Sequence, residues 1–108
     1  MHFHFPSERE LKELAPGIQA RTFWGEKMLV AIVTLEPQTH LPNHSHPHEQ
    51  VGIILEGKLQ FTIDGETRIL EPGDVYTIPG NIEHEAKTFE KPVKVMDVFN
   101  PVREEYQY

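Results

Sequence analysis

The sequence contains no cysteine, and this absence excludes several kinds of chemistry. Disulfide bonds, zinc sites with thiolate ligands and thiol nucleophiles all require cysteine. Any metal ion that the chain binds must therefore be held by nitrogen and oxygen donors, such as imidazole, carboxylate and amide groups.

The chain also has few basic residues and no long hydrophobic run. The chain has 10 Lys and Arg against 17 Asp and Glu, a net charge of −7, which argues against nucleic acid as a partner. No apolar run approaches the roughly 18 residues of a membrane span. Residues 1–6 have neither the basic nor the apolar part of a secretory signal. We therefore expect a cytoplasmic protein with a single domain over residues 1–108 and no membrane partner.

One short helix is expected near the N-terminus. Ser7 and Glu10 have the spacing of a capping box, in which each side chain accepts a hydrogen bond from the other residue's backbone N–H. This pattern predicts a helix over Glu8–Leu14, which the Pro16-Gly17 pair would end.

After this helix the hydrophobic period changes to two, which is typical of β-strands. Turn signals such as Asp64-Gly65 separate the segments. The expected strands are residues 18–24, 28–35, 51–57, 59–63, 67–70, 75–78 and 93–99. Several short strands with turns between them predict an antiparallel sandwich or barrel.

The segment Met28–Leu35 differs from the other strands because it is apolar on both faces. A strand of this kind is usually buried on both sides. In a chain of 108 residues a second buried face indicates contact with another copy, so we expect a homodimer.

The most informative pattern is a cluster of histidines. His44 and His46 share a face of an extended segment, because residues i and i+2 point the same way, and Gln50 follows closely. His84 comes much later in the chain and would have to reach them from another strand. Imidazole is the commonest side-chain metal ligand near neutral pH. These residues are therefore candidate ligands of one metal ion.

The spacing of these residues resembles the two motifs of the cupin superfamily. The first motif, His-x-His-x3-(Glu/Gln)-x6-Gly, is matched by residues 44–57. The second, Gly-x5-Pro-x-Gly-x2-His, is matched by residues 73–84 with Asn81 in place of glycine, and Asn tolerates the left-handed backbone conformation well. The resemblance implies a cupin-type antiparallel β-barrel of the jelly-roll kind, with a metal held by His44, His46, Gln50 and His84.

A second departure from the motif is Gln50, where cupins usually have glutamate. Three imidazoles and an amide are all neutral, so a divalent ion would keep its full positive charge. Such a site disfavours a trivalent ion and oxygen-activating iron chemistry, and it suits an anionic substrate. We expect one divalent transition metal ion, and the donor set leaves Mn, Fe, Co, Ni, Cu and Zn open.

The C-terminal part resembles small cupins of pectin and alginate degradation, the KdgF type. These proteins combine a His-x-His-Pro-His-Glu-Gln stretch with Asp-x-Phe followed four residues later by Arg, as in Asp97, Phe99 and Arg103. By this resemblance the chain converts a 4,5-unsaturated uronate to its linear keto form. Asp97 would transfer protons, Arg103 would hold the substrate carboxylate and Phe99 would belong to the same site. The sequence leaves open another cupin isomerase, a cyclase, a dioxygenase, or a module that binds a small sugar acid without turnover.

Other residues have less distinctive settings. His48 offers a second His-x-His frame with His46, but the position four residues beyond it is Gly52, which has no donor side chain. We therefore expect His48 at the rim of the site and His40 in a loop. Tyr76 is expected as a core or dimer contact.

Overall fold

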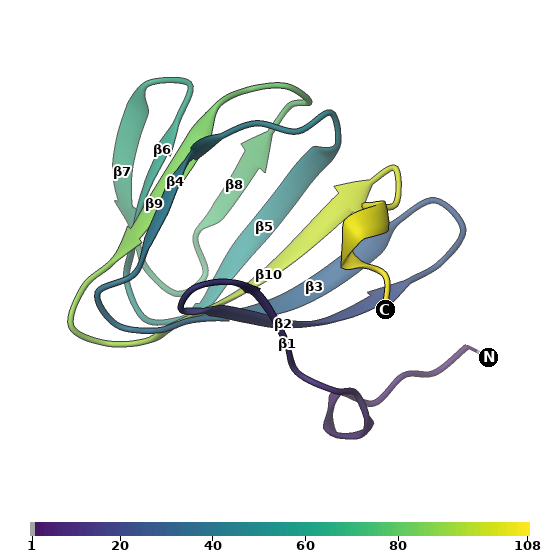
Figure 1. Cartoon of the computed structure of the whole chain (residues 1–108). Coiled ribbons are helices and arrows are strands. Elements are labelled where there is room, and N and C mark those ends of the chain that lie inside the picture. The colour runs from purple at the N-terminus through teal and green to yellow at the C-terminus, as the bar shows by residue number, and fades with distance from the viewer. Residues whose placement is uncertain (1) are drawn as a thin grey trace.

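The computed structural model describes residues 2–108, which form two antiparallel sheets facing one another (Figure 1). The six-stranded sheet has the order β1-β2-β3-β10-β5-β8, and the four-stranded sheet has the order β4-β9-β6-β7. The elements are 3-10 turns η1 (Pro6–Glu8) and η2 (Glu104–Tyr106) and strands β1 (Lys12–Ala15), β2 (Ile18–Trp24), β3 (Leu29–Leu35), β4 (His40–His44), β5 (Glu49–Glu56), β6 (Leu59–Ile63), β7 (Glu66–Leu70), β8 (Val75–Ile78), β9 (His84–Thr88) and β10 (Val93–Asn100). The predicted all-β class is confirmed, in the form of a two-sheet sandwich.

The predicted helix over Glu8–Leu14 is wrong. The chain forms only the 3-10 turn η1, which Phe5 precedes without a side-chain cap, and it then enters β1, which pairs with β2. A seven-residue helix is marginal on its own because few backbone bonds offset the cost of nucleation. As an edge strand, residues 12–15 pair with β2 and pack Leu14 against the core.

Two strands that the sequence analysis missed bring the candidate ligands together. β4 and β9 pair antiparallel with His44 opposite His84. β4 contains Pro42, which has no N–H to donate, and it lies at an edge of the four-stranded sheet where proline is tolerated. Its sequence, His-Leu-Pro-Asn-His, lacks the alternation by which the other strands are recognised.

The hydrophobic core lies between the two sheets. Leu29, Ala31, Val33 and Leu35 of β3 point inward and are at most 6% exposed. The outward residues of β3 are only partly buried in the single chain. The expected second buried face is thus available for a partner, and the homodimer stays a prediction.

The turns follow the sequence signals closely. Asp64 and Gly65 both have positive φ, 49° and 80°, as a tight hairpin between β6 and β7 requires. Asn81 has φ of 67°, the left-handed conformation that its place in the motif predicts. No helix within residues 2–108 has the length and apolarity needed to cross a bilayer.

Candidate metal centre

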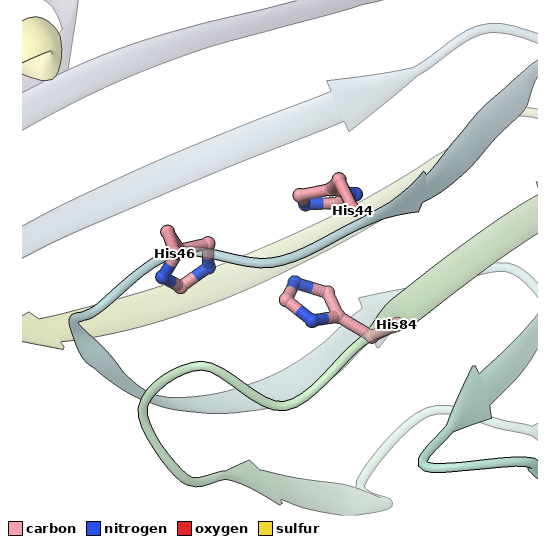
Figure 2. A group of neighbouring side chains, drawn as sticks. All are labelled: His44, His46 and His84. Carbon is pink, nitrogen blue, oxygen red and sulfur yellow. The ribbon is translucent and has the colours of Figure 1, made fainter.

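Three histidines from two strands and one loop face one another (Figure 2). His44 ends β4, His84 begins the paired β9, and His46 lies in the loop that leads into β5. One ring nitrogen from each residue lies within 4.8 Å of the others, a grouping that could hold a metal ion. The structure therefore brings His44 and His84, which are 40 positions apart in the sequence, together because β4 and β9 are neighbours.

Backbone carbonyls fix the orientation of two of these rings. Nδ1 of His44 lies 2.8 Å from the carbonyl oxygen of Pro42, and Nδ1 of His84 lies 2.9 Å from that of Ile82. A carbonyl can only accept a hydrogen bond, so each Nδ1 carries the proton and each Nε2 keeps a free lone pair. Nε2 of His84 is buried without a hydrogen-bond partner among residues 2–108. A buried lone pair without a donor fits a bound cation.

Gln50 extends the ligand set. Its Oε1 lies 3.0 Å from Nε2 of His46, and both side chains are buried. Two donor atoms on adjacent corners of an octahedral site with bonds of about 2.1 Å lie about 3.0 Å apart, so this spacing fits two ligands of one ion.

The electrostatic setting favours the neutral form of the His46 and His84 imidazoles. Burial, followed by the positive charge of Arg103 and the nearby His84, lowers the pKa of His46 to about 4. Burial also lowers the pKa of His84 from its usual 6.5. Neutral imidazoles offer their lone pairs at physiological pH, which is the form that a metal requires.

The loop between β4 and β5 contacts the loop between β8 and β9 at this site. The backbone N–H of Asn81 donates a 2.7 Å hydrogen bond to the carbonyl of His46. A Cβ atom at Gly80 would lie 2.4 Å from the carbonyl oxygen of Pro47, so only glycine permits this approach. Gly80 and Asn81 therefore help to position the loop that carries His46.

A cavity of about 230 Å³ lies beside the histidines, between the sheets. Its polar lining residues are His44, Gln50, Tyr76, His84, Asp97, Arg103 and Tyr106. Phe99 and other core side chains supply the apolar wall. Three of the four candidate ligands and all three candidate catalytic residues thus border one small cavity.

Asp97 and Phe99 share the inward face of β10, as their spacing predicts, and they are 7% and 2% exposed. Burial raises the pKa of Asp97 to about 6, although hydrogen bonds from Tyr76 and Gln50 and the charge of Arg103 oppose the rise. A carboxyl group with this pKa can both accept and release a proton near neutral pH.

Arg103 is held at the cavity by aromatic rings. Its guanidinium carbon lies 5.1 Å from the ring centre of Phe99 and 4.1 Å from that of Tyr106. Its side chain is 13% exposed, and the Nε atom lies 3.5 Å from a carboxylate oxygen of Glu105. A guanidinium in this setting can bind an anion that enters the cavity.

The sequence analysis missed two residues of this site. Tyr76, expected in the core or at a dimer contact, donates a 2.5 Å hydrogen bond to Oδ1 of Asp97. Tyr106 also borders the cavity. His40, which was expected in a loop, instead begins β4 and lies on the surface with its Nε2 3.1 Å from a carboxylate oxygen of Glu85. The ring of His48, which was expected at the rim of the site, lies 5.6 Å from that of His46. No local motif marks either tyrosine, since both are defined by contacts between distant segments.

Comparison with known proteins agrees with this geometry. Residues 31–99 match the family described as the cupin domain. The chain is 26% identical over 106 residues to the pectin degradation protein KdgF of Dickeya dadantii (strain 3937), with 96% of both chains covered. The structure of KdgF from Halomonas sp. superposes with a TM-score of 0.91 at 27% identity, covering 99% of both chains.

A third comparison concerns the fold alone. The RmlC-like cupin from Shewanella frigidimarina NCIMB 400 superposes with a TM-score of 0.92 at 23% identity, covering 99% of this chain and 96% of that one. The predicted jelly-roll arrangement is therefore confirmed.

Proposed function

The chain belongs to the cupin domain family, and we propose that it is a metal-dependent enzyme that converts a 4,5-unsaturated uronate to its linear keto form. One observation carries this proposal: a neutral ligand set, a buried carboxyl group and a guanidinium border the same small cavity. The similarity to KdgF proteins along nearly the whole chain supports a sugar acid from pectin as the substrate class.

The proposed metal ligands are His44, His46, Gln50 and His84. The free Nε2 atoms of His44 and His84, and the 3.0 Å spacing between His46 and Gln50, support this assignment. A divalent ion held by these neutral groups would supply a Lewis acid that polarises a substrate oxygen. The donor set accepts Mn, Fe, Co, Ni, Cu or Zn.

Arg103 is proposed to bind the substrate carboxylate. A guanidinium donates two parallel hydrogen bonds to a carboxylate, and stacking on Tyr106 and Phe99 limits the orientations that it can adopt. Phe99 also presents an apolar wall that excludes water from the substrate ring.

Asp97 is proposed to transfer protons. The reaction is an isomerisation: the hydroxyl at C1 loses its proton as the bond from C1 to the ring oxygen breaks, and the resulting enol becomes a ketone at C5 when C4 gains a proton. No oxidant or additional water is consumed. With a pKa of about 6, Asp97 can remove one proton and deliver another at neutral pH.

The decisive experiment follows the C4=C5 absorbance of unsaturated galacturonate in the presence of metal-loaded protein. The absorbance should fall faster than the spontaneous rate, and NMR should identify the linear keto product. The variant His46→Ala tests metal dependence, and His40→Ala, which changes a surface histidine, is its matched control. Tight binding at the spontaneous rate would instead identify a sugar-acid binding module, and consumption of oxygen would identify a dioxygenase.

A further inference from the structure

Three adjacent strands place Tyr76, Gly52 and Asp97 in a single row across the six-stranded sheet. Asp97 of β10 is paired with Gly52 of β5, and Gly52 is paired with Tyr76 of β8 (Figure 1 shows the three strands side by side). Because neighbouring strands lie about 4.8 Å apart, β8 and β10 are separated by about 10 Å. Only a long side chain from one outer strand can contact a side chain of the other.

Gly52 makes this contact possible. A Cβ atom at Gly52 would lie 2.3 Å from Oδ1 of Asp97 and 2.3 Å from the hydroxyl oxygen of Tyr76. Gly52 does not belong to the glycines with positive φ, so its backbone conformation is open to other residues. The absence of a side chain, not a special backbone angle, is therefore what this position requires.

The hydroxyl of Tyr76 lies 2.5 Å from Oδ1 of Asp97, to which it donates a hydrogen bond. The tyrosine is 6% exposed, and its ring lies 4.6 Å from that of Phe61, so its orientation is fixed by packing. Burial, followed by the charge of Asp97, raises the pKa of Tyr76 well above its usual value. The hydroxyl therefore keeps its proton and acts only as a donor to the carboxylate.

We propose that Tyr76 is a positioning residue, which reaches across Gly52 and holds the Asp97 carboxylate with Oδ1 occupied and Oδ2 directed to the substrate. This inference rests on the proposed role of Asp97 in proton transfer. A carboxylate on a short side chain can rotate, and a rotated one presents the wrong oxygen or the wrong angle. The short hydrogen bond from the rigid Tyr76 ring, in addition to the one from Gln50, limits that freedom.

The test uses Tyr76→Phe, which keeps the ring and its contact with Phe61 but removes the hydroxyl. The variant should lower kcat by about 10- to 100-fold, the loss that corresponds to one hydrogen bond to a charged group. KM and metal content should stay within about twofold of the wild type, because Arg103 and the candidate ligands are untouched. Thr62→Val is the matched control, because it also removes a hydroxyl that bridges two strands, here to Thr67 at 2.8 Å outside the cavity.

A double variant distinguishes positioning from general support of the fold. If Tyr76 acts through Asp97, adding Tyr76→Phe to Asp97→Asn should lower kcat no further. Losses that multiply in the double variant, or a Tyr76→Phe variant with wild-type kcat, would overturn the inference. Gly52→Ala should reproduce the loss of kcat in any fraction that folds, as judged by its thermal transition.

A structural measurement separates this inference from the proposed reaction. In a crystal structure of metal-loaded Tyr76→Phe, the Asp97 carboxylate should be rotated or occupy two rotamers. If the carboxylate keeps its wild-type orientation, the positioning role is wrong even if the wild type is active. If the wild type does not turn over the uronate but the carboxylate rotates, the proposed reaction fails and the positioning role stands.

Discussion

Nε2 of His46 lies 3.0 Å from Oε1 of Gln50, and both atoms belong to buried side chains. The same glutamine also lowers the pKa of Asp97 through a side-chain hydrogen bond, so it contacts both the candidate metal ligands and the candidate proton carrier. Gln50 can therefore coordinate a cation through its Oε1 while its amide N–H groups face the Asp97 carboxylate.

This double contact predicts the effect of Gln50→Glu. A negative ligand should tighten metal binding, and it should weaken the binding of an anionic substrate, because the net charge of the site falls by one. Metal titration and calorimetric binding of the uronate measure the two effects separately. Unchanged affinities for both would show that Gln50 does not contact the ion.

The local part of the candidate site could be predicted from sequence. His44, His46 and Gln50 lie within one short segment, and the turn at Asn81 is encoded by a residue that tolerates its φ of 67°. The pairing of β4 with β9 was missed because β4 has little alternation and contains a proline. The candidate ligands were thus identified without the two strands that position His44 and His84.

The contacts between distant strands could not be predicted. Tyr76 and Asp97 are brought together by the register of β8 and β10 on β5, which depends on the whole sheet and not on local spacing. In the N-terminal segment, by contrast, a local sequence signal predicted a helix that does not form. Ser7 and Glu10 carry a local helix signal, but a short isolated helix is marginal, whereas β1 pairs with β2 and packs Leu14 against the core.

The outer face of the six-stranded sheet predicts a homodimer. Ile32, Met96 and Ile53 lie side by side on β3, β10 and β5 and are only partly buried in the single chain. Ile32→Glu should therefore give a folded monomer, because a charge on this apolar row opposes association while the core stays intact. Ile69→Glu, at a 56% exposed position of the other sheet, is the matched control and should stay dimeric.

Light scattering at micromolar concentration, together with circular dichroism, checks this prediction. A monomeric wild type would show that the two-sided apolarity of β3 does not reflect an interface between copies.

Arg103→Lys should raise KM far more than it lowers kcat. A lysine keeps the positive charge but cannot donate two parallel hydrogen bonds to a carboxylate, and it stacks less well on Phe99 and Tyr106. Steady-state kinetics with unsaturated galacturonate should show a rise in KM of about 10-fold or more, which corresponds to the loss of one charge-assisted hydrogen bond. An unchanged KM would place the substrate carboxylate elsewhere.

Asp97 should also destabilise the metal-free protein at neutral pH. Its pKa is raised from 3.8 to about 6 on folding, so the folded state binds the proton more tightly than the unfolded chain. The stability from this proton is fully present below about pH 4 and is lost as the pH rises through about 6. Asp97→Asn should therefore be more stable than the wild type at pH 7, by on the order of 2 kcal/mol. Urea unfolding across this range measures the difference, and a constant difference would mean that Asp97 has no raised pKa.

The same substitution should have the opposite effect on activity. Asp97→Asn preserves the shape of the side chain and an acceptor for the Tyr76 hydroxyl, but it can no longer carry a proton. We expect kcat to fall by about 10²–10⁴-fold, the usual contribution of a positioned acid or base. Metal content should be nearly unchanged, because Asp97 is not proposed as a ligand. Elemental analysis and kinetics on one preparation decide between the roles: loss of metal would make Asp97 a ligand, whereas full metal and full turnover would make it a structural partner of Tyr76.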